Sequence, residues 1–405
     1  MSSNNSIALN PKDLRIRLTV LTGGLLIIGL VALYSISDNP LSIGSSFFRQ
    51  CIFILLSIFV YILVRTISLK TIHDNSITIF IGIVILCFIP FLLPQVEYTY
   101  RWIDLGFMTI QPSEYLKFAL IIVIAQYLSN HQLKVKSKSI IIIPVILTLF
   151  CAGIVLNQPD LGTAVIICAP LIPMLLWAGV NGFVIFLMIT PIITILAASN
   201  TIFFSIWAII MFLCFLMFRP NLISGSVLYF ANIFTGLLSP FFWNNLAEYQ
   251  KQRILTFLNP DLDPMGSAYH IIQSVTAIGS GGFFGKGFGQ GSQTQLKFLP
   301  VQESDFILSV IAEEFGFMGI SVVMIIFFLF IKTLLDIAFK LSDYFSSLVI
   351  VGITSILLSH IFINSAMTIG LLPVKGLPLP FISAGGSFLL SCFIMLSLVI
   401  NLSDN

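Results

Sequence analysis

The residues best suited to chemistry stand where a long polar segment meets an apolar run. Asp305 directly precedes an apolar run that begins at Phe306. A carboxylate at the edge of a low-dielectric region has a raised proton affinity, which suits a general base. A helix cap is an equally ordinary role for Asp305 or Ser304, so both interpretations remain open. Glu313 and Glu314 follow about 12–14 Å further along the expected helix, and we expect them to face the protein interior and hydrogen-bond to neighbouring helices, because unpaired acids in an apolar span are costly.

A second group of polar residues combines cations with a carboxylate. Arg101 opens the segment Arg-Trp-Ile-Asp-Leu-Gly, and Gln111 opens the segment Gln-Pro-Ser-Glu-Tyr-Leu-Lys. Pro112 suits the first position of a helix, on which Glu114 and Lys117 would share one face. Two interpretations remain open. Glu114 and Lys117 form an internal ion pair, or Arg101 and Lys117 neutralise a diphosphate.

A third group lies in a segment rich in proline and glycine. The range 370–381 contains three prolines and one charged residue, Lys375, and a Ser-Ala-Gly-Gly-Ser sequence follows at 383–387. We expect a re-entrant or broken segment, which is tolerated in a membrane only where protein or water satisfies the backbone. Asp160 adds a carboxylate at another helix junction, where a helix cap is its ordinary role.

The composition defines the kind of protein that must position these residues. The chain has 405 residues, of which 58% are hydrophobic and 9% charged, whereas a soluble domain carries about 25% charged residues. So few charged side chains cannot form the polar surface of a soluble protein, so lipid must solvate most of the chain. A net charge of +2 excludes nucleic-acid binding, which needs a concentrated basic face. The sequence therefore predicts an all-α polytopic membrane protein.

Twelve apolar stretches are long enough to cross a bilayer, some of them marginally, because about 20 helical residues span the hydrocarbon core. We predict a bundle of about ten to twelve transmembrane helices. A cytoplasmic tail at 1–17 precedes one transmembrane domain at 18–402, and a cytoplasmic end follows at 403–405. The stretches are 18–37, 46–66, 77–95, 114–129, 139–157, 161–180, 182–198, 201–218, 223–242, 306–331, 345–369 and 379–402.

Basic residues indicate the orientation, since Lys and Arg concentrate in short cytoplasmic loops. The clearest cluster is Lys134, Lys136 and Lys138, which falls on the cytoplasmic side if the N-terminus does. Both termini are then cytoplasmic. Most of the acidic residues fall on the outer side, so we expect a reaction site to face outward.

The longest segment without a span is 243–304, an extracytoplasmic loop in this orientation. Ile271, Val275 and Ile278 recur at helical spacing, which indicates a short helix lying along the membrane surface. The glycines that follow do not match a phosphate-binding loop, because Lys286 is followed by glycine where that motif requires Ser or Thr. A hinge or close-packed turn is the favoured interpretation.

Taken together, the chain resembles the SEDS family of shape, elongation, division and sporulation proteins, most closely its RodA branch. The resemblance covers about residues 15–402 and follows the family's order. Residues Tyr269–Ser274 favour RodA, whereas Lys375 before Gly376 is closer to the FtsW branch. The segments that carry it are Arg101–Gly106, Gln111–Lys117, Gln158–Thr163, Tyr249–Arg253, Asp263–Ser274, Gly279–Lys286, Phe298–Glu314 and Asn364–Ser387.

The resemblance implies a peptidoglycan glycosyltransferase that polymerises lipid II at the outer face of the bacterial cytoplasmic membrane and supports cell elongation and rod shape, or else division or sporulation. It implies that Asp305 is the catalytic base and that undecaprenyl diphosphate leaves with inversion. The implied partners are lipid II, the lipid-linked glycan strand, a class B penicillin-binding protein that acts as transpeptidase, and other membrane proteins of the elongation complex.

The resemblance also implies roles for the remaining polar residues. A divalent cation, Mg²⁺ or Mn²⁺, could assist the leaving group with Asp160 and Glu114 as ligands, and no organic cofactor is expected. We expect substrate or diphosphate binding from Arg101, Lys117, Lys375, Glu114 and Gln111. We expect supporting roles for Glu303, Ser304, Glu313 and Glu314.

The chain departs from the family in two places. Relatives commonly read Leu-Pro-Glu-x-His-Thr-Asp before the catalytic helix, whereas Val301, Glu303 and Ser304 replace the Glu, His and Thr here. Family members usually have one span where this chain offers three, at 182–198, 201–218 and 223–242.

Two other functions stay open from the sequence. A lipid II flippase would also have many spans with buried charge, although the polar residues gather at one face and no inverted repeat is apparent. A non-catalytic scaffold for cell-wall enzymes is the third interpretation.

Overall fold

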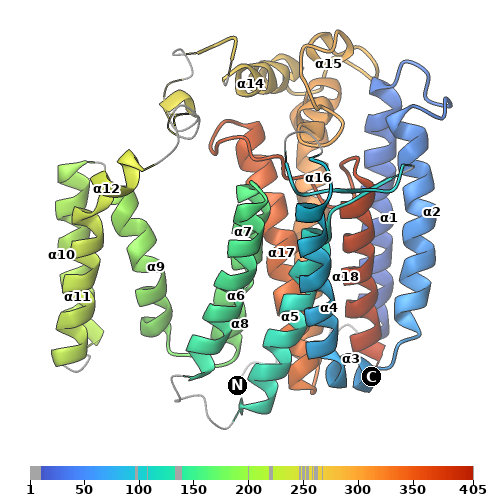
Figure 1. The fold of residues 1–405 in the computed structure, drawn as a ribbon. Helices are drawn as coiled ribbons and strands as arrows, with labels where there is room; N and C mark the ends of the chain where they lie inside the picture. The colour runs from blue at the N-terminus through green and yellow to red at the C-terminus, as the bar shows by residue number, and fades with distance from the viewer. Residues whose placement is uncertain are drawn as a thin grey trace, which may run out of the picture. The chain divides into compact units, whose positions relative to one another are not determined.

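The computed structural model describes residues 11–95, 99–106, 108–132, 139–198, 200–218, 222–245, 248, 251, 255–257, 259, 263–266 and 268–404. Most of tail 1–17, the lysine cluster at 134–138 and most of Tyr249–Arg253 lie outside these residues. The described chain is almost entirely helical, which confirms the prediction of an all-α fold (Figure 1). Its only sheet within those ranges is the antiparallel pair of β1 (Ile103–Asp104) and β2 (Thr109–Ile110), with Ile103 opposite Ile110.

Each of the twelve predicted spans contains one helix or two successive helices. Six described helices, α1, α2, α6, α16, α17 and α18, are long and apolar enough to cross a membrane by themselves, with α1 counted from Lys12. The helices of the predicted spans are α1 (Pro11–Ile36), α2 (Ser46–Arg65), α4 (Ser76–Phe88) with η1 (Ile89–Leu92), α5 (Pro112–Asn130), α6 (Ser139–Asn157), α7 (Leu161–Cys168) with α8 (Leu171–Trp177), α9 (Gly182–Ala197), α10 (Thr201–Phe218), α11 (Leu222–Leu237), α16 (Ile307–Lys340), α17 (Tyr344–Thr368) and α18 (Gly386–Asp404).

Of the four remaining described helices, three lie between the predicted spans, and the fourth, at 239–244, begins within the predicted span 223–242. They are α3 (Leu69–Asp74), α12 (Ser239–Asn244), α14 (Tyr269–Gly281) and α15 (Ser292–Gln295). Helix α14 is the short helix predicted from the spacing of Ile271, Val275 and Ile278, and Ile271 is buried while Val275 is exposed. The helix is therefore confirmed, and its position along a membrane surface stays a prediction.

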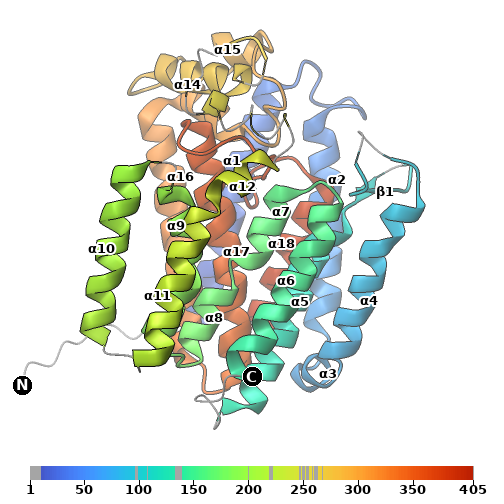
Figure 2. The same ribbon diagram turned by 60° about the vertical axis from the view of Figure 1, so that its left-hand side comes forward.

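The chain forms two compact units, one made of 1–174 with 263–405 and the other of 175–262. In the first unit, α1 packs on α16, α2 on α18, α4 on α5, and α17 between α16 and α5. Helices α17 and α18 are largely buried, and they occupy the middle of this unit (Figure 2). In the second unit, α9 packs against α10 and α11, and Trp207 Nε1 donates to Thr194 Oγ1 at 2.8 Å. The single transmembrane domain at 18–402 stays a prediction beside this division.

The last predicted span begins later than expected. The sequence predicts 379–402, whereas α18 begins at Gly386. Pro378 and Pro380 cannot donate backbone hydrogen bonds, and the N–H of Leu379 donates to Ser383 Oγ at 2.8 Å instead of a helical carbonyl. Residues 370–385 therefore form an irregular connection, as predicted for a broken segment.

One end of the first unit collects the polar segments. Helices α5, α7, α16 and α18 begin there and α17 ends there, so the irregular connections before or after them meet. Helices α14 and α15 lie across this end, whereas the C-terminus after α18 lies at the opposite end (Figure 1). At that opposite end Asp404 forms ion pairs with Arg15 of α1 and with Arg65 of α2.

Candidate active site

Asp305 lies in the turn that leads into α16 and is half-buried. Its backbone N–H donates to Val301 O at 3.1 Å, and Ser304 Oγ donates to its Oδ1 at 3.0 Å. Burial raises the pKa of Asp305, while the hydrogen bond from Ser304 and the charge of Arg101 act in the opposite direction. The carboxylate does not cap α16, because no side-chain cap bond forms at the start of that helix. The geometry therefore suits a proton acceptor better than a helix cap.

The irregular segment 370–385 packs directly against this turn. Asn364 of α17 is fully buried, and its Nδ2 donates to Asp305 O at 2.9 Å and to Leu377 O at 2.7 Å. Gly376 has φ of +65°, and a Cβ at this position would lie 3.4 Å from Asp305 Oδ2. Glycine thus permits both the backbone conformation and the close approach of the segment to the carboxylate.

A second carboxylate, Asp160, lies near another part of the irregular segment 370–385. Its Oδ1 accepts the N–H of Thr163 at 3.0 Å, so it caps α7, and its Oδ2 accepts Gln111 Nε2 at 2.8 Å. The guanidinium of Arg101 lies 3.9 Å from Asp160, and about a third of this side chain is exposed. A Cβ on Gly162 would lie 2.8 Å from Lys375 O, so the chain at Lys375 passes close to this junction. Arg101, Gln111, Asp160 and the backbone of Lys375 are therefore neighbours.

Glu114 and Lys117 lie deeper and form the internal ion pair. Lys117 is fully buried, and its Nζ lies 2.6 Å from Glu114 Oε2 and 3.0 Å from His360 Nε2. His360 Nδ1 lies 3.2 Å from Pro378 O, which links the pair to the irregular segment. Ser391 Oγ also donates to Glu114, at 3.2 Å. Of the two interpretations of Lys117, the structure favours the ion pair, since a substrate cannot reach a fully buried ammonium in this arrangement.

The predicted cation ligands do not form a metal site. Both oxygens of Asp160 already accept hydrogen bonds, from Thr163 and Gln111, and Glu114 is paired with Lys117. In the described ranges, no three His, Cys, Asp or Glu side chains come together as a metal-binding group. These residues therefore do not fit a cation held by the protein alone.

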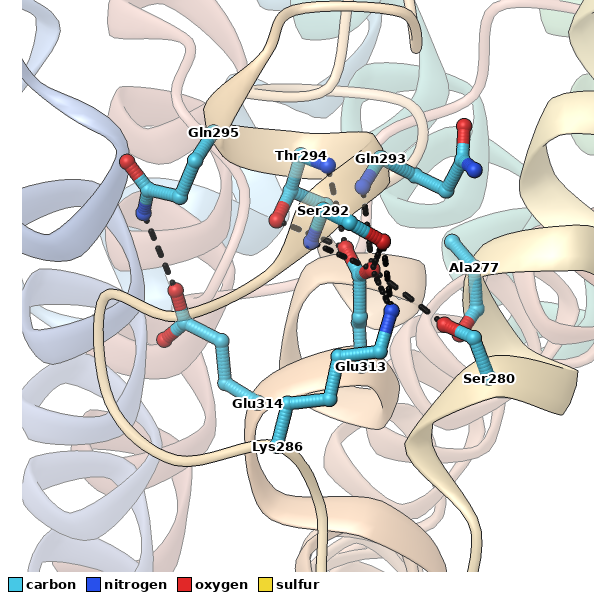
Figure 3. Close-up of polar contacts among 9 residues, drawn as sticks. All are labelled: Ala277, Ser280, Lys286, Ser292, Gln293, Thr294, Gln295, Glu313 and Glu314. Atoms are coloured by element: carbon cyan, nitrogen blue, oxygen red, sulfur yellow. Dashed lines mark hydrogen bonds and ion pairs between the residues drawn. The ribbon is translucent and has the colours of Figure 1, made fainter.

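Glu313 anchors the glycine-rich segment to α16 (Figure 3). Its Oε1 accepts Lys286 Nζ at 2.8 Å and the N–H groups of Ser292 and Gln293 at 2.8 and 3.0 Å, and its Oε2 accepts Thr294 N at 3.0 Å. The prediction that Glu313 bonds to neighbouring helices is confirmed, because Ser292, Gln293 and Thr294 belong to α15 and Ser280 of α14 also donates to its Oε1 at 3.2 Å. Lys286, in the connection between α14 and α15, is an additional partner. The connection that carries Lys286 reaches α16 where this helix is kinked at Gly316, with φ of +65° and the segment near Gly285 packed against its backbone. The glycines therefore form a close-packed turn.

Glu314 and Glu303 make contacts on other helices. Glu314 accepts a hydrogen bond from Ser35 of α1 and one at 3.3 Å from Gln295 Nε2. Glu303 accepts a hydrogen bond from Ser46 at the start of α2, and its backbone carbonyl accepts the N–H of Ala384 at 2.9 Å. Glu303 holds the turn before Asp305 to α2 and to Ala384, whereas Glu314 links α16 to α1 and α15. Neither contacts the carboxylate of Asp305 in the hydrogen bonds described.

Two residues at this site were not singled out from the sequence. His360 is an ionisable residue inside an apolar run, which is itself a signal of function or of a buried partner. Asn364 lies one helical turn further on, so the two side chains share the face of α17 that meets Pro378 and Leu377. A search for polar residues at a spacing of four within apolar runs would have found the pair.

The fold and the site define a polytopic membrane protein with a half-buried carboxylate at one end of its helical bundle. The family of FtsW, RodA and SpoVE, described as cell cycle proteins, matches residues 16–217 and 204–405, so the chain belongs to this family. This membership confirms the resemblance inferred from the sequence. The chain is therefore a multi-pass bacterial membrane protein.

Similar proteins agree with this membership. The peptidoglycan glycosyltransferase RodA of Treponema pallidum is 30% identical over 93% of this chain and 94% of its own length. The peptidoglycan glycosyltransferase MrdB of Escherichia coli K12 is 34% identical over 72% of this chain and 67% of its own length. Stage V sporulation protein E of Bacillus subtilis is 30% identical over 95% of this chain and 96% of its own length.

Solved structures share the fold. A chain from work on how a peptidoglycan synthase complex coordinates polymerization and crosslinking matches with a TM-score of 0.69, 22% identity and coverage of 96% of both chains. The rod shape determining protein RodA of Thermus thermophilus matches with a TM-score of 0.62 and 20% identity, over 96% of this chain and 95% of its own.

Proposed function

We propose that this chain is a peptidoglycan glycosyltransferase that polymerises lipid II into glycan strands. The observation that carries the proposal is the position of Asp305, a half-buried carboxylate held by Ser304 and by Asn364 through its backbone, at the polar end of a bundle that belongs to a family of named glycosyltransferases. Substrates anchored in a bilayer by their lipid part require such an end, where apolar helices meet polar segments. The proposed role is support of cell elongation and rod shape.

Asp305 acts as the general base. The carboxylate takes the proton of the 4-hydroxyl group of an incoming lipid II, and the oxygen attacks the anomeric carbon of the lipid-linked strand. The bond between that carbon and the diphosphate oxygen breaks, so undecaprenyl diphosphate leaves and the configuration inverts. The raised pKa of Asp305 suits this step, because a carboxylate with a higher proton affinity is the stronger base.

The leaving diphosphate needs neutralisation of charge more than it needs a proton. Arg101 is the best placed cation, because its guanidinium is partly exposed, only 3.9 Å from Asp160, and close enough to influence Asp305. Lys375 is the second, on the segment that packs against Asp305. Gln111 supports this arrangement through its hydrogen bond to Asp160, while Glu114 and Lys117 act indirectly through His360 and Pro378.

The polar end of the first unit faces outward in this proposal. Both termini then lie in the cytoplasm, and the site lies on the outer side of the cytoplasmic membrane. We further propose a class B penicillin-binding protein as the partner that crosslinks the strands, together with other membrane proteins of the elongation complex. The shared fold with a chain from a peptidoglycan synthase complex supports a partner of this kind.

The experiment uses purified protein, with and without a cognate transpeptidase, and labelled lipid II. Wild-type protein should form glycan strands, and Asp305→Asn should not, although it keeps the size and hydrogen-bonding shape of the side chain. Asp74→Asn is the matched control, because Asp74 is an exposed carboxylate on α3 and should leave polymerisation unchanged. A folded Asp305→Asn protein that still polymerises lipid II would refute the assignment of the base.

A lipid II flippase is the second candidate, favoured by one observation. Lys117, Glu114 and His360 form a fully or nearly fully buried charged group inside the bundle, as transporters often contain. Transport of labelled lipid II across vesicles without polymer would support this alternative. Neither transport nor polymer, with and without the transpeptidase, would support a scaffold.

A further inference from the structure

A separate pocket of about 580 Å³ lies between the α1–α2 connection and residues 297–303. Its volume falls within the range of small-molecule sites, about 300–1,000 Å³. The lining is rich in hydroxyl, amide and charged groups. Among the lining residues are Ser37, Asn39, Ser46, Arg49, Gln302 and Glu303. This lining suits a polar ligand rather than a lipid chain.

The charges around the pocket leave one cation available. The lining contains two acids and two bases, so it carries no net charge. Lys297 pairs with Asp38, and Glu303 accepts a hydrogen bond from Ser46. Arg49 is exposed and makes no ion pair with any residue in the described part of the chain. An exposed guanidinium in neutral surroundings suits one carboxylate, which it binds through two hydrogen bonds, better than a diphosphate with its higher charge.

An unpaired buried acceptor gives a second, independent observation. Gln302 lines the pocket with only 7% of its surface exposed, and its Oε1 accepts no hydrogen bond within the described residues. Buried polar groups are normally paired, because an acceptor without a donor is unfavourable. An N–H group of a ligand would satisfy this oxygen once the side-chain amide turns toward the pocket, because the oxygen has almost no exposed surface in the present rotamer. A ligand that offers a carboxylate to Arg49 and an N–H group to Gln302 has the chemistry of a peptide.

The pocket adjoins the proposed catalytic base. Glu303 is two residues before Asp305, and two residues extend over no more than about 7 Å. The backbone of Glu303 and Ser304 is held to the segment 370–385, since the N–H of Ala384 donates to Glu303 O and Ser383 Oγ donates to Ser304 O. A ligand in the pocket would therefore be fixed relative to Asp305.

We propose that this pocket binds the peptide carried by a peptidoglycan precursor while the sugar of the same molecule lies at Asp305. The inference rests on the proposed function, which supplies a substrate made of sugar and peptide. Arg49 binds a peptide carboxylate, and Gln302 accepts a peptide N–H.

Binding of two soluble ligands to wild-type protein tests the proposal. One is the precursor disaccharide with its peptide, and the other is the same disaccharide without the peptide. Neither carries the lipid diphosphate, so neither can donate a sugar and binding is measured without turnover. We expect the peptide to strengthen binding about tenfold. Equal affinities, or no binding of the peptide-bearing ligand at millimolar concentration, would overturn the proposal.

Variants then assign the effect to the pocket. Arg49→Gln and Gln302→Leu should weaken binding of the peptide-bearing ligand about five- to tenfold and leave the other ligand unchanged. The controls Lys70→Gln and Gln132→Leu remove similar groups from exposed positions near the opposite end and should change neither affinity. An equal loss of affinity for both ligands would indicate a structural effect of the substitution and would overturn the assignment. Displacement of the peptide-bearing ligand by inorganic diphosphate would also overturn it. Because these ligands do not react, failure of Asp305 as the base would leave this result intact.

Discussion

Substitution of Asn364 tests how strongly the position of Asp305 depends on its support. Asn364 is fully buried, and its Nδ2 alone joins two segments, through Asp305 O at 2.9 Å and Leu377 O at 2.7 Å. Asn364→Leu keeps the number of non-hydrogen atoms and the branched shape of the side chain, and it removes both hydrogen bonds. The carboxylate of Asp305 and its hydrogen bond from Ser304 stay in the chain. The substitution therefore changes placement and not chemistry.

The cost follows from the two carbonyls that lose their donor. A hydrogen bond inside a membrane protein contributes about 0.6 kcal/mol on average, and a buried acceptor left unpaired costs about 1–3 kcal/mol. The free energy of unfolding should therefore fall by about 1–6 kcal/mol. The effect on catalysis is separate, because a displacement of a reacting group by about 1 Å costs about 100-fold in rate. We expect kcat for polymerisation of lipid II to fall by about that factor, with a smaller change in KM.

Asn401→Leu is the matched control. Asn401 is also a buried asparagine near a helix end, and its Nδ2 donates to Ile67 O at 2.7 Å and Val64 O at 3.5 Å, at the end of the unit away from Asp305. It should lose a similar amount of stability and keep kcat within about twofold. The measurements are thermal unfolding and gel analysis of the glycan products. If the two variants lose the same activity, or if Asn364→Leu keeps wild-type kcat, the positioning argument is wrong.

Three further predictions address charge. Burial raises the pKa of Asp305, so as the pH is lowered kcat/KM should begin to fall at a higher pH than it would for an exposed aspartate. Arg101 lowers this pKa, so Arg101→Gln should shift the fall to a still higher pH. A pH profile of polymerisation that is unchanged in the variant would contradict this prediction. Glu313→Gln should destabilise the protein by about 2–3 kcal/mol, because Lys286 loses its buried partner, and should increase proteolysis within 282–295; unchanged unfolding would count against it. Purified protein should contain less than one equivalent of Mg²⁺ or Mn²⁺ by elemental analysis, since Asp160 and Glu114 are already paired; a bound equivalent would show a site elsewhere.

Most of the fold could be predicted because long apolar runs have few alternatives in lipid. The hydrophobic runs of α2 and α17 predicted these helices to within about one residue at each end, since backbone groups in an apolar surrounding must pair within the helix. The predicted start of α18 was wrong, although Pro378 and Pro380 indicated that no helix runs through 378–380. Length and hydropathy outweighed the missing donors in that prediction.

Less of the site could be predicted, because distant contacts decide it. The sequence indicated Asp305 as a base or a cap, and the structure shows no cap bond at the start of α16. The placement of Asp305 depends on Asn364, which lies 59 positions away along the chain. Lys117 remained open between an ion pair and a diphosphate ligand for the same reason, since His360 comes from another helix. Glu313 was expected to meet helices and does meet α14 and α15, whereas its ion pair with Lys286, in the loop between them, was not predicted.

Several buried polar side chains of this protein contact the irregular segment 370–385 or residues that bind it. His360 reaches this segment at Pro378, Asn364 reaches it at Leu377, and Gly376 lies against Asp305. A backbone without helical hydrogen bonds is stable in an apolar bundle only if side chains supply the missing partners. The contact between Lys117 and His360 therefore helps to hold segment 370–385 rigid beneath the site around Asp305. A transport pathway would instead require these groups to be freed in turn, which would remove the support of Asp305 at each cycle.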